Sequence, residues 1–169
     1  MLEAVTKSLG FTPKLYAGLA ESPTALQVSL DAAAAFGKSS LGAAEQQVVL
    51  LATSVENGCE FCVAAHSFIA RNMVKVPSPV VDALRAGRAL PDARLDALAT
   101  FTRAVVRDRG GVTPGMLAAT FAAGFSRAQV LDVIVGVSVK TLSNYANHLL
   151  KTPINPQFAQ EAWQPLHAA

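Results

Sequence analysis

Two cysteines and a histidine are the residues of this chain best suited to chemistry. Cys59 and Cys62 are the only cysteines among 169 residues, and His66 follows one helical turn after the second. Residues three, four and seven apart on an α-helix project from one side. The spacing therefore predicts that both thiols and the imidazole share one helix face, an arrangement that favours thiol redox chemistry.

The sequence supports activation of either sulfur. Asn57-Gly58 interrupts an apolar run, so we expect a helix to begin at about Gly58 and to hold Cys59 in its first turn. Free backbone N–H groups and the helix dipole stabilise a thiolate there. His66, four residues beyond Cys62, could instead take the proton of that second thiol. The dipole thus favours Cys59, whereas the base favours Cys62.

Two other roles for the cysteine pair compete with redox chemistry. A zinc site needs two further ligands, for which the chain offers only His66, His148 and His167. Alternatively, the thiols are inert and pack as small apolar side chains. Redox activity is favoured over both, and we predict no metal and no cofactor.

The residues around the cysteines resemble a known superfamily. Residues 45–52 read EQQVVLLA and residues 55–66 read VENGCEFCVAAH. This stretch is similar to the core of the carboxymuconolactone decarboxylase superfamily, and more closely to its alkylhydroperoxidase D-like branch. The pattern of that branch is a glutamate ahead of Asn-Gly-Cys-x-x-Cys-x-x-x-His. A looser likeness, to the end of the same domain, covers residues 144–149 and Thr152-Pro153.

The resemblance implies an all-helical, oligomeric thiol peroxidase. In such a protein the second cysteine attacks the peroxide, so Cys62 is the peroxidatic candidate. The first cysteine, Cys59, then forms an intramolecular disulfide with it, and His66 relays protons together with a glutamate. That glutamate lies twelve residues before the first cysteine, where this chain has Gln47.

The glutamine changes the expected proton relay. Gln47 can form hydrogen bonds but cannot exchange a proton at neutral pH. Glu45 would point roughly 160° away from it on an unbroken helix. Glu56 and Glu60 are closer to the cysteines in sequence and are candidates to replace the missing carboxylate. We therefore expect weaker peroxidase activity, or a related thiol reaction that needs less help from a base.

The composition is typical of a compact domain that self-associates. At 169 residues one domain is expected, with 51% hydrophobic and only 15% charged residues and a mean hydropathy of +0.35. Such low charge suggests that neighbouring subunits cover part of the surface, which favours a homo-oligomer. The family likeness suggests a trimer or a hexamer.

Membrane and nucleic-acid partners are not expected. The longest apolar runs, 48–55 and 130–139, are far shorter than the roughly 20 residues of a membrane span. The net charge is only +2, and the arginines at 103, 107 and 109 lack interleaved aromatic residues. Residues 1–7 lack the features of a secretory signal, and cysteines that cycle suit a reducing cytoplasm.

Capping signals predict an all-α protein. Ser22-Pro23, Ser78-Pro79 and Thr113-Pro114 each place a hydroxyl before a proline, and residues 126–129 form a capping box. We expect one domain over residues 1–150 and a C-terminal tail over 151–169, whose Phe158 and Trp163 dock on the body of the domain or on a neighbouring subunit. Helices are predicted near 14–20, 23–36, 43–56, 58–73, 79–86, 92–109, 114–123 and 127–150.

A weak internal repeat adds three second-shell candidates. At an offset of 82 residues, Gln47 recurs as Gln129 and His66 as His148. Chance similarity between two Ala- and Val-rich helices explains this as well as duplication does. Under duplication, His148 would support the site from a second shell, together with Asn144 and Tyr145.

Three functions of different classes remain open. The leading one is a thiol-dependent peroxidase or disulfide reductase, which reduces small hydroperoxides and is itself reduced by a lipoyl or thioredoxin-like dithiol. The second is lactone decarboxylation, although decarboxylase members of the superfamily act without paired cysteines. The third is a non-enzymatic helical assembly that uses a redox-sensitive disulfide.

Overall fold

The chain is helical throughout the part that the structure describes. The structure is a computed structural model, which describes residues 2–166. No β-strand occurs among these residues, so the predicted all-α class is confirmed. The elements are α1 (Leu2–Leu9), α2 (Lys14–Leu19), α3 (Pro23–Gly37), α4 (Ala43–Glu56), α5 (Glu60–Phe68), η1 (Ile69–Val74), α6 (Ser78–Arg85), α7 (Ala93–Arg107), α8 (Pro114–Ala122), α9 (Arg127–Leu150) and η2 (Pro156–Glu161).

Most predicted helices are present, with two differences. Helix α1 was not predicted, because no capping residue or long apolar run marks it. The helix predicted over 58–73 is α5 followed by one stretch of π-helix, η1, which ends where Lys75 adopts a left-handed conformation. The caps at Ser22, Thr113 and Ser126 each accept a hydrogen bond from the backbone N–H three residues later.

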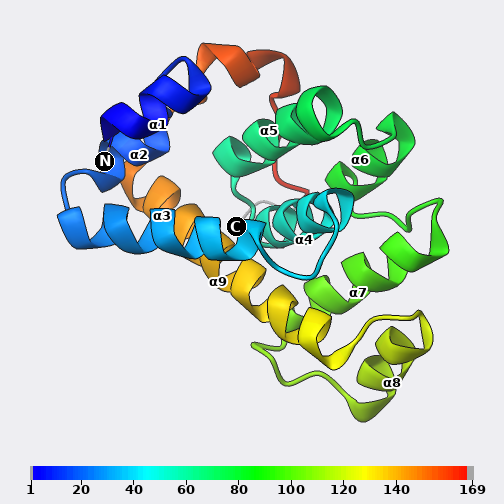
Figure 1. The fold of residues 1–169 in the computed structure, drawn as a ribbon. Coiled ribbons are helices and arrows are strands. Elements are labelled where there is room, and N and C mark those ends of the chain that lie inside the picture. The colour runs from blue at the N-terminus through cyan, green and yellow to red at the C-terminus, as the bar shows by residue number, and fades with distance from the viewer. Residues whose placement is uncertain (1, 167–169) are drawn as a thin grey trace.

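Helix α4 lies at the centre of the molecule. Every residue from 47 to 55 is buried, as expected for a helix that is apolar on all sides. Helices α5, α6, α7 and α9 pack around it, and α3 crosses α9 (Figure 1). The core is divided into two apolar clusters, one around α4 and α7 and a second around α2 and α5. The second cluster contains both cysteines.

A glycine lets α9 approach the core closely. A Cβ atom at Gly136 would lie 2.7 Å from side-chain atoms of Phe36 and Val49. Only a residue without a side chain therefore fits between α9 and helices α3 and α4. This close approach brings Lys140 and Asn147, one and three turns further along α9, toward the cysteines.

A second glycine turns the chain from α4 into α5. Gly58 has a φ of 65°, in the left-handed region that glycine adopts without steric cost. Its N–H donates to the carbonyl of Val55, and the N–H of Cys59 donates to that of Ser54. The turn thus ends α4 and places Cys59 against the helix that carries Gln47.

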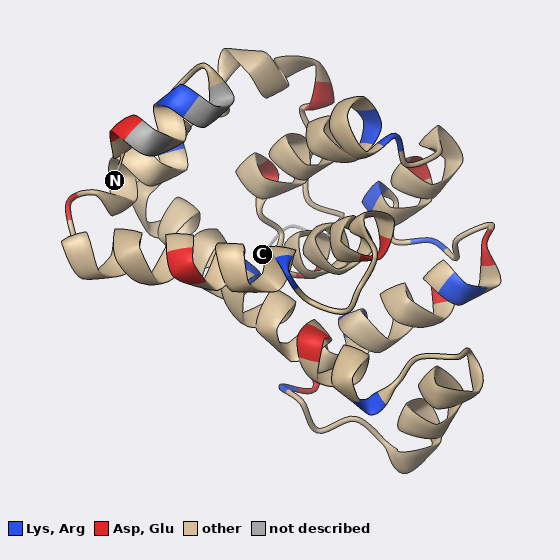
Figure 2. Ribbon diagram, viewed as in Figure 1, with Lys and Arg blue, Asp and Glu red and all other residues tan. Residues whose placement is uncertain are grey.

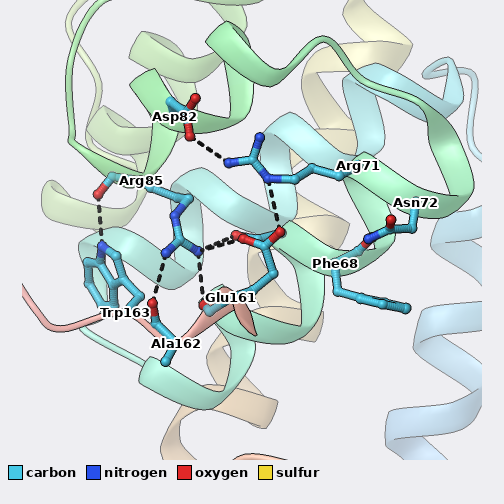
Figure 3. Close-up of polar contacts among 9 residues, drawn as sticks. Phe68, Arg71, Asn72, Asp82, Arg85, Glu161, Ala162 and Trp163 are labelled. Carbon is cyan, nitrogen blue, oxygen red and sulfur yellow. Dashed lines mark hydrogen bonds and ion pairs between the residues drawn. The ribbon is translucent and has the colours of Figure 1, made fainter. Parts of the chain in front are cut away.

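The C-terminal segment is held on the body by two arginines. The Glu161 carboxylate forms ion pairs with Arg71, at 3.0 Å, and Arg85, at 3.5 Å (Figure 3). Arg85 also donates to the carbonyls of Glu161 and Ala162, and Trp163 Nε1 donates to the Arg85 carbonyl at 2.9 Å. These contacts fix residues 156–163 beside α5 and α6.

The same segment supplies an aromatic wall to the cysteine cluster. Phe158 is buried and packs against three other rings, those of Phe11, Phe61 and Phe68, with centroids 5.5 to 6.2 Å apart. Edge-to-face packing of this kind stabilises an aromatic cluster beyond the area it buries. The tail therefore forms part of the candidate site and docks on its own chain, which was one of the two alternatives predicted for Phe158 and Trp163.

Charges are sparse on the described surface. Figure 2 shows acidic and basic residues scattered over the ribbon, without a stripe of one sign. Within residues 2–166 no single helix is long and apolar enough to span a membrane. Helices α8 and α9 meet that criterion only as a pair, which is bent by 115°.

Candidate functional site

The two cysteines lie at the start of α5, which begins at Glu60, two residues later than predicted. Cys59 is the N-cap residue, with an extended backbone, and Cys62 lies in the first helical turn. The helix dipole and the free N–H groups therefore favour a thiolate at Cys62 as well. Both side chains are about 1% exposed. The dipole argument therefore no longer favours Cys59 alone.

An asparagine on α9 bridges the two sulfurs. Asn147 Nδ2 donates to Cys62 Sγ at 3.3 Å and to Cys59 Sγ at 3.7 Å. The side chain is 4% exposed, so these bonds form away from water. An amide N–H that donates to sulfur favours the charged form of a thiol. Sequence reasoning did not identify Asn147, because 85 residues separate it from Cys62.

A buried lysine lies between the thiol and the histidine. Lys140 Nζ is 2.8 Å from His66 Nε2 and 3.9 Å from Cys62 Sγ, and its side chain is 5% exposed. Sequence reasoning missed this residue too. One signal was available, since Lys140 is the only lysine, arginine or acidic residue between positions 132 and 151.

His66 contacts the glutamine that replaces the family's glutamate. His66 Nδ1 lies 3.1 Å from Gln47 Oε1. The lysine ammonium has no lone pair, so His66 Nε2 must accept from it, and Nδ1 must then carry the proton that it donates to Gln47. The three side chains form a chain of hydrogen bonds from Lys140 through His66 to Gln47.

The surroundings separate the acidities of the two thiols. A hydrogen bond from Cys59, the charge of Lys140 and the amides of Asn144 and Asn147 lower the pKa of Cys62 to about 6, against the opposing effect of burial. The hydrogen bond to Cys62, burial and the nearby thiolate raise the pKa of Cys59 above its ordinary value. At neutral pH Cys62 is therefore a thiolate and Cys59 a thiol.

Burial and the charge of Lys140 lower the pKa of His66 well below its ordinary value. The imidazole is consequently neutral at pH 7, as the hydrogen-bond pattern requires. The neutral imidazole can hold the Lys140 ammonium in place. It can carry an extra proton only if its surroundings change during the reaction so that its pKa rises.

The three glutamates proposed as replacements lie away from the thiols. Glu45 accepts from the backbone N–H of Gly42 and pairs with Arg94 at 2.9 Å. The Glu56 carboxylate lies 3.9 Å from Arg107, and Glu60 is exposed. None of them makes a hydrogen bond to Cys59, Cys62 or His66 in the described part of the chain. The charged side chain next to Cys62 is that of Lys140, which is a cation and not a carboxylate.

The three second-shell candidates separate into one buried residue and two exposed ones. Asn144 is fully buried, and its Oδ1 accepts a hydrogen bond from Asn57 Nδ2 at 2.9 Å. Its amide also lowers the pKa of Cys62. Tyr145 and His148 are exposed.

A cavity of about 430 Å³ opens onto Cys62. Tyr16 lines it, and burial together with the neighbouring Cys62 raises the pKa of this phenol. The polar groups that meet at its inner end are those of Cys62, His66 and Lys140. The remaining lining is mainly apolar and includes Phe11, Leu15, Phe61, Phe68, Ile69, Met73 and Phe158.

No metal site is formed by the residues described. Within 2–166, no three His, Cys, Asp or Glu side chains come close enough to bind one ion. His167, one of the three histidines considered as zinc ligands, lies outside the described residues.

Comparisons with known proteins give one family match and two similar folds. A sequence model of the Carboxymuconolactone decarboxylase family matches residues 24–104, which include Gln47, both cysteines and His66. No curated protein matches the chain. Two solved structures are similar over 93% of this chain and 84% of their own. One is an uncharacterized peroxidase-related protein from Ralstonia eutropha JMP134 with an alkylhydroperoxidase AhpD core, at 25% identity and a TM-score of 0.83.

The other is an uncharacterized peroxidase-related protein from Silicibacter sp. TM1040, at 19% identity and a TM-score of 0.82. The second likeness concerns the fold alone. The family model thus covers the segment that carries both cysteines and the histidine, and the likeness to the first structure extends over nearly the whole chain. The chain is similar to the Carboxymuconolactone decarboxylase family over residues 24–104, and its fold is similar to that of a structure with an alkylhydroperoxidase AhpD core.

Proposed function

We propose that this protein is a thiol-dependent peroxidase that reduces organic hydroperoxides at Cys62. The observation that carries this proposal is the surroundings of Cys62. Its sulfur is held in the thiolate form at the inner end of an apolar cavity, with a second thiol and a buried cation beside it. A thiolate with a pKa below the ambient pH is the form that attacks peroxides.

In the first step the Cys62 thiolate attacks the terminal oxygen of the hydroperoxide. A sulfur–oxygen bond forms, the oxygen–oxygen bond breaks, and the alkoxide leaves. The sulfur is oxidised to a sulfenic acid, and the alkoxide takes a proton to become an alcohol. The Lys140 ammonium, next to Cys62, is the proposed source of stabilisation and of the proton.

In the second step Cys59 attacks the sulfenic acid of Cys62. A sulfur–sulfur bond forms, the sulfur–oxygen bond breaks, and the proton of Cys59 leaves with the hydroxide as water. The raised pKa of Cys59 keeps this thiol protonated until the sulfenic acid has formed. Asn147 contacts both sulfurs and so holds them together for this step.

Lys140, His66 and Gln47 act here as a relay without a carboxylate. His66 accepts from Lys140 and donates to Gln47, which fixes the direction in which the ammonium points. We assign His66 and Gln47 positioning roles, and we assign Lys140 the role of charge partner to the thiolate. Glu45, Glu56 and Glu60 have no part in this mechanism.

The catalytic cycle needs a dithiol reductant, for which a lipoyl or thioredoxin-like donor is proposed. A reducing cytoplasm would keep such a donor available. Self-association is proposed as well, as a trimer or hexamer. An exposed apolar stripe along α9, formed by Leu131, Ile134, Val135, Tyr145 and Leu149 at helical spacing, supports it.

A stoichiometric experiment tests the function. The reduced protein, Cys59→Ser and Cys62→Ser would each receive one equivalent of tert-butyl hydroperoxide, and free thiols and intact mass would be followed. We expect the wild type to lose two thiols and two mass units, and Cys59→Ser to form a sulfenic acid. Cys62→Ser should not react. Thiols that stay reduced for hours would overturn the proposal and favour the decarboxylase or assembly functions.

A further inference from the structure

A second cavity reaches the other sulfur of the pair. It has a volume of about 470 Å³ and is lined by Cys59, but not by Cys62. The cavity described above shows the reverse, since it is lined by Cys62 and not by Cys59. Phe61, between the two cysteines, lines both cavities and separates them. The dithiol is thus approached from two sides, with one sulfur on each side.

The second cavity is chemically unlike the first. Its walls include Lys151, His148 and Thr152, whereas the first is largely aromatic. Two of its wall residues carry polar atoms with unused hydrogen-bonding capacity. Asn147 Oδ1 and Thr152 Oγ1 are buried without a partner in the described part of the chain. Buried polar groups are nearly always satisfied, so this wall is prepared for a polar ligand.

We propose that this second cavity receives the reductant, a compact dithiol, and that the reductant attacks Cys59 and not Cys62. The inference rests on the proposed function, since it concerns the return of the disulfide to the dithiol. The Asn147 and Thr152 oxygens would bind the remaining thiol or another polar group of the donor, in a cavity whose charged lining residues are Glu60 and Lys151. Hydroperoxide and reductant would then enter by separate routes.

The exchange balances in two steps. The donor thiolate attacks Cys59 Sγ, a mixed disulfide forms, and the Cys59–Cys62 bond breaks with Cys62 leaving as a thiolate. The donor's second thiolate then attacks the donor sulfur of the mixed disulfide. Cys59 leaves and takes up a proton, and the donor departs as its own cyclic disulfide. The donor is oxidised by two electrons and the protein is reduced by two.

Leaving-group chemistry supports attack at Cys59. Thiol–disulfide exchange is faster when the departing sulfur is the more stable thiolate. Cys62 is that sulfur, because Asn147 and Lys140 stabilise its negative charge. Attack at Cys62 would instead release Cys59, which Lys140 does not contact.

Bulky substitutions at the two entrances test the separation. His148→Trp would narrow the second cavity and Met73→Trp the first, and both residues are exposed. Val28→Trp, at an exposed position of α3 that lines neither cavity, controls for an added ring. The disulfide would be made with diamide, so that its reduction is measured without peroxide. Reduction by dihydrolipoamide and oxidation by cumene hydroperoxide would be followed by rapid alkylation with N-ethylmaleimide and intact mass.

Relative to Val28→Trp, we expect His148→Trp to slow reduction at least tenfold and Met73→Trp to slow oxidation instead. The inference would be overturned if both variants slowed reduction equally, or if Met73→Trp alone slowed reduction. If peroxide does not oxidise the thiols at all, the proposed function fails, while the reduction rates still show which entrance the dithiol uses.

Discussion

The ammonium of Lys140 lies 2.8 Å from His66 Nε2, so the histidine cannot present this nitrogen to the thiol of Cys62. The direct transfer of a proton from Cys62 to His66 that the helical spacing suggested is therefore replaced by a contact through the lysine. The reactive thiolate is stabilised by a cation from another helix, and the histidine holds that cation in position.

Removal of the cation should make Cys62 a weaker acid. In Lys140→Met a neutral side chain of similar length replaces the ammonium, so the pKa of Cys62 should rise from about 6. The thiolate fraction at pH 6 would fall about fivefold if the pKa rose to 7. The pH dependence of iodoacetamide alkylation, measured in the Cys59→Ser background, should move to higher pH.

Lys151→Met is the matched control, because Lys151 is exposed. Its alkylation profile should match that of the Cys59→Ser parent. If the alkylation midpoint of Lys140→Met also lay at the same pH as that of the Cys59→Ser parent, the role assigned to the ammonium would be wrong.

The hydrogen bond from Cys59 should contribute to the acidity of Cys62 as well. It is the largest of the effects that lower the pKa of Cys62. Cys59→Ala removes the donor, whereas Cys59→Ser retains a hydroxyl that can donate. We expect the pKa of Cys62 to be higher in Cys59→Ala than in Cys59→Ser, by ultraviolet titration of the thiolate. Equal values in the two variants would show that burial and Lys140 alone determine it.

Restoring the family's carboxylate should strengthen the relay. Gln47→Glu places a carboxylate where Gln47 Oε1 now lies 3.1 Å from His66 Nδ1. An adjacent negative charge favours the imidazolium and so raises the pKa of His66, which lets it hold and release a proton. We expect a severalfold gain in peroxide turnover, measured in a coupled assay. The control Gln160→Glu, at an exposed position of the tail, should leave the turnover rate unchanged. If Gln47→Glu also turned over peroxide no faster than the wild type, proton transfer would not be the limiting step.

Gly136 should be intolerant of a side chain. In Gly136→Ala the new methyl would meet Phe36 and Val49 at 2.7 Å and push α9 outward. Overpacking of this kind costs about 1–3 kcal/mol of unfolding free energy. Urea unfolding should show that loss, and peroxide turnover should fall as Lys140 and Asn147 move away. The control Gly115→Ala, with open space at its Cβ in α8, should be neutral or stabilising.

A charge on the apolar stripe of α9 should weaken self-association. Leu131 is 66% exposed and lies one turn before Ile134 on the same face. Leu131→Asp would place a carboxylate within the proposed interface, and light scattering after size exclusion should show a smaller particle than the wild type. Thr24→Asp, on the exposed first turn of α3, should leave the mass unchanged. A wild-type protein that is already monomeric would contradict the proposed oligomer.

The sequence predicted the helices well because their ends carry local signals. The caps at Ser22, Thr113 and Ser126 act over three residues, so they can be identified without knowledge of the fold. The cysteines and His66 likewise lie on one short helix. The twelve-residue spacing in the family pattern also identified Gln47, which contacts His66 in the structure.

The residues that complete the site could not be predicted in this way. Lys140 and Asn147 reach Cys62 from positions 78 and 85 residues later in the chain. Their approach depends on how α9 crosses α4, and so on the missing side chain at Gly136. Helical spacing relates residues within one helix, but it does not determine which face of a distant helix packs against it.

The buried lysine also gives the site a different net charge in its two redox states. In the reduced protein, the Cys62 thiolate and the Lys140 ammonium neutralise one another, which suits an uncharged hydroperoxide. When Cys62 enters a disulfide, its negative charge disappears. Once Lys140 has regained from solvent the proton that it gave to the alkoxide, its positive charge has no partner. The oxidised site therefore attracts an anion, and the thiolate of a reductant is one. Each turnover would alternate the electrostatic preference of the site between a neutral oxidant and a negatively charged reductant.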